Sequence, residues 1–492
     1  MSLINITNLT FGYEGSYDNI FDNVSFQIDT DWKLGFTGRN GRGKTTFLNL
    51  LLGKYEYCGN ISAAVNFEYF PFEVANPENN TLDVIESIYP DYLHWQVMRE
   101  LSLLKVSEDV LYRPFETLSS GEQTKVLLAA LFLKENSFLL IDEPTNHLDI
   151  EARVIVSDYL RSKRGFILVS HDRAFLDCCI DHILSINKTN IEVQKGNFSS
   201  WWENKKMQDH FELAENEKLR KDITRLSSAA KRTVDWSDKM EKTKVGTRNS
   251  GLRPDRGYIG HKSAKMMKRA KAIEARRQSA VEEKSKLLMN IETSGRLKLS
   301  QLDFHADRLI ELENVSIFYG EKKACADVSF IIEQGDRIAL YGKNGSGKSS
   351  IIKLICGESM TYTGSFRKAS QLRISYISQG TSQLGGSLTD YARAKAIDES
   401  IFKAILRKLD FSRVQFEKDI VDFSAGQKKK VLIAKSLCEK AHLHIWDEPL
   451  NFIDVISRMQ IEELLLEYSP TILFVEHDSE FRKNIATKMF EL

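Results

Sequence analysis

Gly38-Arg39-Asn40-Gly41-Arg42-Gly43-Lys44-Thr45 is the stretch that decides the fold class of this chain. The same pattern returns 304 residues later as Gly342-Lys343-Asn344-Gly345-Ser346-Gly347-Lys348-Ser349. Both copies follow the order G-x-x-x-x-G-K-[ST], which is typical of a loop between a strand and a helix that binds phosphate groups. One match can arise by chance, but two matches with partners downstream predict that a whole domain has been duplicated.

Three further motifs repeat downstream in the same order, with offsets of 305, 305 and 306 residues. They are Leu118-Ser119-Ser120-Gly121-Glu122-Gln123 with Phe423-Ser424-Ala425-Gly426-Gln427, Leu140-Ile141-Asp142-Glu143-Pro144 with Ile445-Trp446-Asp447-Glu448-Pro449, and Ser170-His171-Asp172 with Glu476-His477-Asp478. Because order and spacing agree in both copies, we interpret these residues as parts of two equivalent sites.

The residue types predict the binding of ATP together with Mg²⁺. Glycines let backbone N–H groups point at phosphate oxygens, and the helix that follows presents its positive N-terminal end to the same anion. The lysines are expected to reach the β- and γ-phosphates, and Thr45 and Ser349 are expected to bind Mg²⁺. The predicted nucleotide-binding residues of the two loops are Gly38, Asn40, Gly41, Gly43, Lys44, Thr45, Thr46, Gly342, Asn344, Gly345, Gly347, Lys348, Ser349 and Ser350.

Carboxylates and histidines are the expected catalytic groups. Asp142 and Asp447 each end an apolar strand, where a carboxylate can hold the Mg²⁺ shell. The next residues, Glu143 and Glu448, are placed to orient or deprotonate the attacking water. The candidates for sensing the γ-phosphate follow the next apolar strand, and they are His171 and His477.

Length and composition favour a cytoplasmic protein with more than one domain. The chain has 492 residues, 42% of them hydrophobic. No run approaches the ~18 consecutive apolar residues of a membrane span. The N-terminus lacks the basic and apolar regions of a signal peptide and is expected to form a strand. The six cysteines show no disulfide or metal pattern, which fits a reducing compartment.

The charge is unevenly distributed, although the net charge is zero. Residues 201–300 contain 25 Lys/Arg and 14 Asp/Glu, and residues 242–277 contain 12 basic and 2 acidic residues. A basic element between two mildly acidic domains favours a polyanionic partner.

Helical periodicity predicts a hairpin in this basic region. Apolar residues recur at helical spacing over 201–245 and again over 261–293. Residues 246–260 contain four glycines and a proline, which are expected to break both helices. We predict two long antiparallel helices joined by an irregular tip. A coiled-coil spacer with solvated charges is the alternative interpretation.

The chain is therefore predicted to be an α/β protein in three parts. The first nucleotide-binding domain would span residues 1–200, the helical-hairpin linker 201–300, and the second nucleotide-binding domain 301–492.

Both domains resemble nucleotide-binding domains of the ATP-binding cassette (ABC) superfamily. The superfamily's signature motif matches Ser119 and Gly121 in the first copy and Ser424 and Gly426 in the second. In that superfamily two domains stack head to tail, and each ATP lies between the phosphate loop of one and the signature of the other. The resemblance implies that Lys44 faces the second signature at site one, and that Lys348 faces the first signature at site two. Tyr13 and Tyr319 would stack on adenine, with an ordinary strand aromatic as the alternative for each.

The two copies depart from the superfamily pattern in different ways. Where the superfamily usually has a glutamine, the first copy has Phe72 and the second has Gln379, an expected Mg²⁺ ligand. The second signature begins with Phe423 in place of leucine. The D-loops also differ, Thr145-Asn146-His147-Leu148-Asp149 against Leu450-Asn451-Phe452-Ile453-Asp454. Because both catalytic glutamates are present, both sites are expected to hydrolyse ATP, at unequal rates.

Two tandem cassettes joined by a basic hairpin resemble the ABC-F proteins over essentially the whole chain. The similarity is closest to the Lsa-type antibiotic-resistance group. It rests on Asp31-Trp32-Lys33-Leu34-Gly35, on the phosphate loop that follows, and on Met267-Lys268-Arg269. This resemblance implies a ribosome-associated protein that enters the ribosomal E site, contacts 23S rRNA, displaces the P-site tRNA and extends its linker toward the peptidyl-transferase centre. There it would dislodge lincosamides, pleuromutilins or streptogramin A.

The tip residues expected to act there are Arg253, Pro254, Arg256, Tyr258 and Ile259. The duplication supplies both halves of each site within one chain, so a monomer is expected. Two alternatives stay open: a housekeeping ABC-F translation factor without a drug role, and the ATPase of a transporter with separate membrane subunits. The second alternative gives no account of the basic hairpin.

Overall fold

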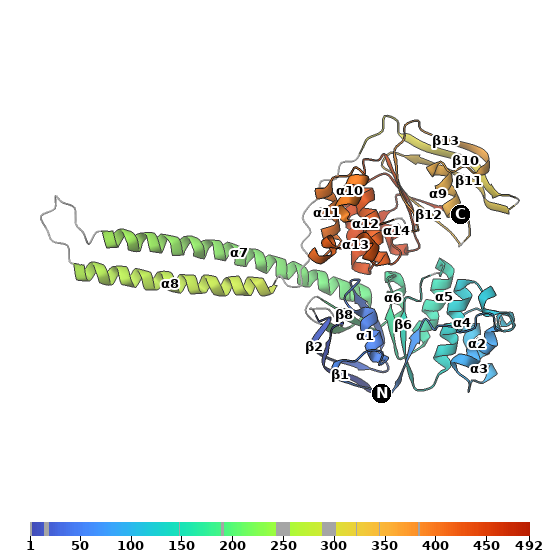
Figure 1. The fold of residues 1–492 in the computed structure, drawn as a ribbon, viewed down its shortest axis with the longest axis horizontal. Helices are drawn as coiled ribbons and strands as arrows, with labels where there is room; N and C mark the ends of the chain where they lie inside the picture. Colours follow the sequence, from blue (N-terminus) through green and yellow to red (C-terminus); the bar gives the residue numbers. More distant parts are fainter. Residues whose placement is uncertain are drawn as a thin grey trace. The chain divides into compact units, whose positions relative to one another are not determined.

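The duplicated motifs lie on two copies of one α/β architecture, as the sequence predicts (Figure 1). This computed structural model describes residues 2–13, 19–146, 148–187, 191–242, 256–287, 302–320, 322–343, 345–381 and 384–492. The chain divides into two compact units. Residues 1–199 and 294–492, which contain both cassettes, form one unit, and residues 200–293 form the other.

The first cassette contains an antiparallel sheet and a mainly parallel sheet. The antiparallel sheet has the order β2 (Phe21–Asp29), β1 (Leu3–Phe11), β4 (Cys58–Ser62). The other sheet has the order β5 (Asn66–Phe70), β6 (Ser137–Asp142), β7 (Phe166–Val169), β3 (Lys33–Gly38), β8 (His182–Ile186), β9 (Ile191–Lys195), with β9 antiparallel to β8. Its helices are α1 (Lys44–Leu51), α2 (Thr81–Ile88), α3 (His94–Leu103), α4 (Ser120–Leu133), α5 (Ile150–Ser162) and α6 (Arg173–Cys179), with short 3₁₀ turns η1 (Glu108–Tyr112) and η2 (Phe115–Thr117).

The second cassette repeats this arrangement. Its antiparallel sheet has the order β11 (Lys322–Glu333), β10 (Arg308–Tyr319), β13 (Thr361–Lys368). Its parallel sheet has the order β14 (Ile374–Ile377), β15 (Leu443–Asp447), β16 (Ile472–Val475), β12 (Arg337–Tyr341), β17 (Lys488–Glu491). Its helices are α9 (Lys348–Cys356), α10 (Leu388–Ala394), α11 (Glu399–Lys408), α12 (Ala425–Cys438), α13 (Val455–Tyr468) and α14 (Ser479–Ile485), with 3₁₀ turns η4 (Arg413–Glu417) and η5 (Ile420–Asp422).

Apolar runs explain the central strands, and the motifs follow where those runs end. Every residue of β7 and of β16 is buried, as expected for strands covered on both faces of a parallel sheet. Strands β6 and β15 end at Asp142 and Asp447. Carboxyl ends of parallel strands share one edge of a sheet, so the catalytic candidates that follow these strands gather there.

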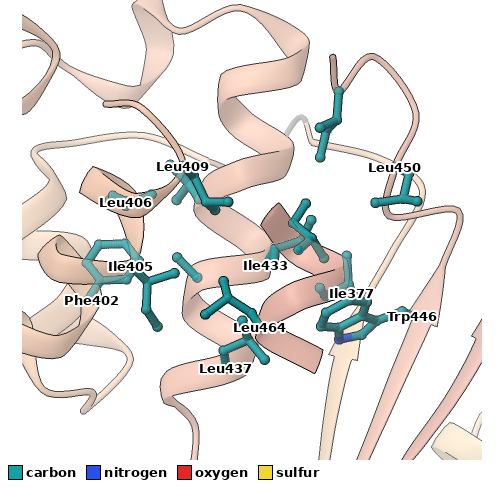
Figure 2. Packing of buried hydrophobic residues seen from close by; sticks show 14 of the residues in the cluster. Ile377, Phe402, Ile405, Leu406, Leu409, Ile433, Leu437, Trp446, Leu450 and Leu464 are labelled. Carbon is teal, nitrogen blue, oxygen red and sulfur yellow. The ribbon is translucent and has the colours of Figure 1, made fainter. Parts of the chain in front are cut away.

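A hydrophobic core fixes the helices of the second cassette against its sheet. Phe402 and Leu406 of α11, Leu437 of α12 and Leu464 of α13 pack in one cluster with Trp446 of β15 (Figure 2). All five side chains are less than 8% exposed. This packing fixes the position of α12, whose first turn carries the second signature.

The basic linker is a helical hairpin, as predicted. Helix α7 (Phe198–Lys242) contains 45 residues and α8 (Arg256–Leu287) contains 32. The two helices lie side by side (Figure 1). Ala230 on α7 and Ala270 on α8 are buried, and such small side chains let two helices approach closely. Within the part of the chain that the structure describes, no helix combines the length and apolar composition that crossing a bilayer requires.

The predicted irregular tip is too long at its C-terminal end. Arg253 and Pro254 lie outside the described residues, whereas α8 already begins at Arg256. The expectation that Arg256, Tyr258 and Ile259 belong to an irregular loop is therefore wrong, because they lie on the first turns of α8. A glycine costs a helix only ~1 kcal/mol relative to alanine, so the two glycines of this stretch do not end a long helix.

Candidate active site

The two phosphate loops have nearly the same backbone. Gly41 and Gly345 both have φ +82°, and Gly43 and Gly347 both have φ +91°. Only glycine adopts these left-handed values without strain. Gly43 and Gly347 directly precede α1 and α9, so each loop ends at the N-terminus of a helix. Asn344, predicted to bind nucleotide, lies outside the described residues.

The loop lysines are buried and point into their own loops. Lys44 Nζ donates to Gly38 O at 2.7 Å, and Lys348 Nζ donates to Gly342 O at 2.9 Å. Burial lowers the pKa of both ammonium groups, against the nearby carboxylates, which raise it. A buried cation ringed by carbonyl oxygens at a helix N-terminus suits a phosphate group.

The space around both loops fits a nucleoside triphosphate. A cavity of about 600 Å³ is lined by Gly41, Lys44 and Thr45, and one of about 820 Å³ by Gly345, Lys348 and Ser349. The loops tolerate no side chain at the glycine before the lysine, because a Cβ on Gly43 would lie 2.5 Å from Ile20 Cγ2. A Cβ on Gly347 would lie 2.7 Å from Ala324 O.

Tyr13 and Tyr319 occupy matching positions beside the loops. The hydroxyl of Tyr13 lies 2.9 Å from Thr46 Oγ1, and the hydroxyl of Tyr319 donates to Ser350 Oγ at 3.3 Å. The two rings are 45% and 51% exposed and line the two cavities. This position suits an aromatic ring that stacks on a base, and stacking on adenine stays a prediction.

Asp142 lies beside the first phosphate loop. Thr45 Oγ1 donates to Asp142 Oδ2 at 3.4 Å, and Tyr69 Oη donates to the same oxygen at 3.0 Å. Burial raises the pKa of Asp142, against the donors that lower it. Sequence reasoning missed the role of Tyr69, whose only local signal is its position in β5, the strand next to β6.

Asp447 is the equivalent carboxylate of the second cassette. Its Oδ1 atom is buried and has no hydrogen-bond partner among the described residues. Burial and the neighbouring Glu448 raise its pKa to about 6. An unpaired buried carboxylate oxygen next to a phosphate site fits the shell of a bound Mg²⁺. Ser349, which hydrogen-bonds Asp447, and Gln379 line the 820 Å³ cavity, which is where the sequence predicts the ion.

The predicted catalytic glutamates each face the predicted histidine. His171 Nε2 lies 3.3 Å from Glu143 Oε1, and His477 Nε2 lies 3.5 Å from Glu448 Oε1. Glu143 and Glu448 have φ +51° and +48°, and such uncommon values in non-glycine residues concentrate at functional sites. The structure therefore brings together each predicted glutamate–histidine pair.

The two glutamates differ in their pKa values. Burial, with the charge of Asp142, raises the pKa of Glu143 to about 8. For Glu448 burial also acts to raise the pKa, but hydrogen bonds from His477, Asn451 and Gln379 outweigh it, and the pKa is lowered. At neutral pH Glu448 is the stronger candidate for a general base.

Contacts between the cassettes begin at the first phosphate loop. Asn40 Nδ2 donates to Phe452 O in the second D-loop at 2.6 Å. A Cβ on Gly426 would lie 2.8 Å from Asn40 Nδ2, so the second signature approaches the first phosphate loop. The pairing of Lys44 with the second signature stays a prediction, which this approach supports. Ser424 itself caps α12 by accepting from Gln427 N.

At the second phosphate loop the neighbouring cassette also contributes its D-loop. Thr145, Asn146 and Leu148 of the first D-loop line the 820 Å³ cavity together with Lys348. Ser119 and Gly121 are not among the residues that line it, and Ser119 caps α4. The pairing of the first signature with Lys348 stays a prediction.

Sequence reasoning also missed two arginines that support the histidine loops. Arg153 Nη1 donates to Asp172 Oδ2 at 2.8 Å, and Arg458 Nη1 donates to Asp478 Oδ2 at 3.2 Å. Arg153 Nη1 also donates to His477 O in the other cassette at 3.4 Å. Their separation of 305 residues, equal to that of the motifs, is the signal that could have found them.

Comparison with known proteins agrees with this geometry. The family model described as "ABC transporter" matches residues 21–146 and 325–451. The chain is 28% identical to "Ribosome protection protein VmlR" of Bacillus subtilis over 97% of this chain and 84% of that protein. It is 26% identical to "ATP-binding protein Uup" of Buchnera aphidicola over 99% of this chain and 80% of that protein.

Solved structures share the fold at lower sequence identity. A crystal structure of an archaeal ribosome recycling factor with an archaeal ribosomal stalk protein matches with a TM-score of 0.63 and 18% identity, covering 98% of this chain and 87% of that chain. A structure entitled "RNase-L Inhibitor" matches with a TM-score of 0.61 and 18% identity, covering 99% and 87%. Together with the two motif sets, these findings show that the chain belongs to the ABC transporter family and carries two ABC ATPase domains of the ABC-F type.

Proposed function

We propose that this protein is an ATP-dependent ribosome protection factor of the Lsa type, cytoplasmic and monomeric. It enters the E site of the bacterial ribosome, contacts 23S rRNA and displaces the P-site tRNA. Its hairpin then extends toward the peptidyl-transferase centre and dislodges lincosamides, pleuromutilins or streptogramin A. The observation that carries the proposal is the similarity to a ribosome protection protein over 97% of the chain, a span that includes the hairpin.

The charge of the hairpin supports a nucleic-acid partner. Residues 242–277 contain 12 basic and 2 acidic residues, and phosphate groups dominate the binding of basic surfaces to RNA. Tyr258 on α8 is 65% exposed, with Lys262 Nζ 6.0 Å from the centre of its ring. An exposed aromatic ring beside cations is suited to stacking on an unpaired base. Ribosome binding should therefore weaken as the salt concentration rises.

The chemistry follows from the two sites. Lys44 and Lys348 bind the phosphates of ATP, while Thr45 with Asp142 and Ser349 with Asp447 and Gln379 hold Mg²⁺. The metal ion would neutralise charge on the phosphate oxygens. Glu143 and Glu448 accept a proton from the attacking water. ATP favours the closed arrangement of the cassettes through its differential affinity, and hydrolysis at both sites releases the protein.

A second candidate is a translation factor without a drug role. Relatives named only "ATP-binding protein Uup" match as much of the chain as the ribosome protection protein does. Both candidates predict ATP-dependent binding to ribosomes. Only the first predicts that the protein restores translation in the presence of drug.

The test is cell-free bacterial translation inhibited by a lincosamide, with and without purified protein. Wild type should restore synthesis, and the double variant Glu143→Gln, Glu448→Gln should fail to restore it or block translation itself. If wild type leaves the inhibition unchanged while the double variant blocks drug-free synthesis, the second candidate holds. If neither protein affects translation, both candidates are wrong.

The hairpin is tested in the same assay by a pair of matched variants. Tyr258→Ala removes an exposed aromatic ring near the start of α8 and should weaken protection. Trp236→Ala is the control, because Trp236 on α7 is 64% exposed, almost equal to Tyr258. Equal effects of the two variants would argue against a specific role for Tyr258.

A further inference from the structure

An ion cluster joins the first phosphate loop to the second cassette. Asp410 Oδ2 lies 3.5 Å from Arg39 Nε and 3.5 Å from Arg42 Nη2. Arg39 is 4% exposed and Asp410 is 28% exposed. The cluster is therefore partly shielded from water, and its charges interact more strongly than those of an ordinary surface pair.

The same loop also donates hydrogen bonds to the second D-loop. Asn40 Nδ2 donates to Phe452 O at 2.6 Å, and the Asn40 backbone N donates to Asp454 Oδ2 at 3.4 Å. Asp454 is fully buried and is paired with Lys430 Nζ at 3.2 Å. Three residues of the first phosphate loop, Arg39, Asn40 and Arg42, thus contact the second cassette directly.

The position of Asp410 has a structural counterpart in the first cassette, and it is Lys105. Each residue follows the C-terminal end of a helix, α11 or α3, in a left-handed conformation with φ +64° or +52°. Asp410 N donates to Arg407 O at 3.0 Å, and Lys105 N donates to Ser102 O at 3.1 Å. Both pairs repeat the 305-residue offset of the motifs, so the two turns are equivalent and their charges are opposite.

The second phosphate loop also differs in charge. Lys343 and Ser346 stand where the first loop has Arg39 and Arg42. Lys105 and Lys343 are both positive, so they cannot form at site two the ion pair that Asp410 and Arg39 form at site one. Lys343 Nζ instead pairs with Glu151 Oε2 at 3.0 Å, with side chains 79% and 68% exposed. An exposed pair of this kind contributes little to stability.

We propose that Asp410 is a positioning residue that holds site one closed on its nucleotide, whereas Lys105 leaves site two free to open and exchange. This inference rests on the proposed binding of two ATP molecules between the cassettes, and it does not depend on the role at the ribosome. Site one then retains nucleotide and keeps the cassettes associated while site two turns over.

The test measures the release of a fluorescent ATP analogue with Mg²⁺ from the full-length Glu143→Gln, Glu448→Gln protein. An excess of ATP displaces the analogue in a stopped-flow instrument, so hydrolysis does not enter the measurement. Two release phases are expected. Lys44→Ala should remove the slow phase, and Lys348→Ala should remove the fast phase.

Charge substitutions then address the inference itself. Asp410→Lys should accelerate the slow phase by about tenfold, the change that ~1.4 kcal/mol produces, and should leave the fast phase unchanged. Arg42→Ser, which copies Ser346, should act in the same direction with a smaller effect. Lys105→Asp should slow the fast phase. The thermal midpoint of each variant checks its folding, and Asp410→Asn is the milder substitute if Asp410→Lys does not fold.

The outcomes separate this inference from the proposals on which it rests. A slow phase that is unchanged by Asp410→Lys and Asp410→Asn overturns the inference, as does a slow phase that survives Lys44→Ala. Two analogues per chain with equal release rates overturn it while leaving the two sites intact. One analogue per chain overturns the two-site proposal as well. Because the assay contains no ribosomes, a failure to restore translation leaves this inference untouched.

Discussion

Glu143 and Glu448 occupy equivalent positions in the two cassettes, yet their pKa values move in opposite directions. Each follows the last residue of a strand, has φ near +50° and faces a histidine. Burial raises the pKa of Glu143 to about 8, whereas hydrogen-bond donors outweigh burial and lower that of Glu448. A duplicated backbone therefore does not guarantee duplicated chemistry.

The difference arises from residues outside the glutamate motif itself. Asn451 Nδ2 donates to Glu448 Oε2 at 2.8 Å, and Gln379 lowers the same pKa. The first cassette has Phe72 where the second has Gln379, and a phenylalanine side chain carries no donor. A donor to a carboxylate stabilises its charged form, so the absence of a glutamine at Phe72 helps to leave burial as the dominant influence on Glu143.

The largest expected effect is on ATP hydrolysis. Removing a general base typically costs about 10²–10⁴-fold at its site. At pH 7 Glu448→Gln should therefore reduce the total ATPase rate more than Glu143→Gln, because Glu448 is ionised and Glu143 is largely protonated. In the Glu448→Gln protein the remaining rate should rise with pH as Glu143 loses its proton. Steady-state phosphate release across pH measures both effects, and equal losses with identical pH profiles would contradict the comparison.

The next effect concerns a buried ion pair between the cassettes. Arg173 Nη1 donates to Glu462 Oε2 at 3.3 Å, and both side chains are less than 10% exposed. The duplication places Ser479 of the second cassette at the position of Arg173, and Ser157 of the first cassette at the position of Glu462, so this ion pair has no counterpart at these positions. Arg173→Ala should lower the free energy of unfolding by about 3–5 kcal/mol, because it leaves the Glu462 charge buried and unpaired.

Urea unfolding followed by tryptophan fluorescence measures this loss. Ser479→Ala is the matched control and should change the free energy of unfolding by less than ~0.5 kcal/mol. Replacing both charges, with Arg173→Met and Glu462→Leu, should recover much of the loss. Similar losses of unfolding free energy for Arg173→Ala and Ser479→Ala would show that the Arg173–Glu462 ion pair does not stabilise the fold.

A third effect separates the cassettes by their stability in acid. His444 of β15 is 6% exposed, and its Nδ1 lies 3.1 Å from Ser436 Oγ, whereas the equivalent first-cassette residue is Leu139. Burial lowers the pKa of His444 from 6.5 to about 4. Because the unfolded chain binds a proton first, the stability of the fold falls as pH drops from 6.5 toward 4, by up to about 3 kcal/mol.

His444→Leu, which copies the first cassette, should remove this part of the acid sensitivity. Thermal unfolding between pH 7 and pH 4.5 measures it, with wild type beside the variant. A wild-type midpoint that falls no faster with decreasing pH than that of His444→Leu would exclude His444 as a source of acid instability.

The smallest expected effect is on Mg²⁺. Residues that support a metal site typically change metal affinity by about 10–100-fold, and Gln379 lines the second cavity. Gln379→Phe should therefore raise the Mg²⁺ concentration for half-maximal nucleotide binding at site two by about tenfold. Phe72→Gln should lower it at site one. Titration of analogue fluorescence with Mg²⁺ in Lys44→Ala or Lys348→Ala proteins assigns each value, and no change in either variant would remove the glutamine as a cause of asymmetry.

The sequence by itself determined the fold class and the duplication, and it named the candidate site residues, whose roles stay predictions. This was possible because binding a phosphate requires glycines, a lysine and a hydroxyl at fixed spacing within a few residues of each other. The predicted pairs Glu143 with His171 and Glu448 with His477 do meet, since parallel strands end at one edge of the sheet. The helical hairpin was also predicted, although its second helix begins at Arg256 and not after residue 260.

The sequence showed that the two copies differ, but only the tertiary structure decided which contacts set the two sites apart. Tyr69 bonds Asp142 across 73 positions of sequence, and Asp410 meets Arg42 across 368. Such contacts depend on how strands and cassettes pack, and no local pattern encodes them. The opposite pKa values of Glu143 and Glu448 have the same origin in part, because burial and donors far along the chain, such as His477 and Gln379 for Glu448, set the free energy of each charge.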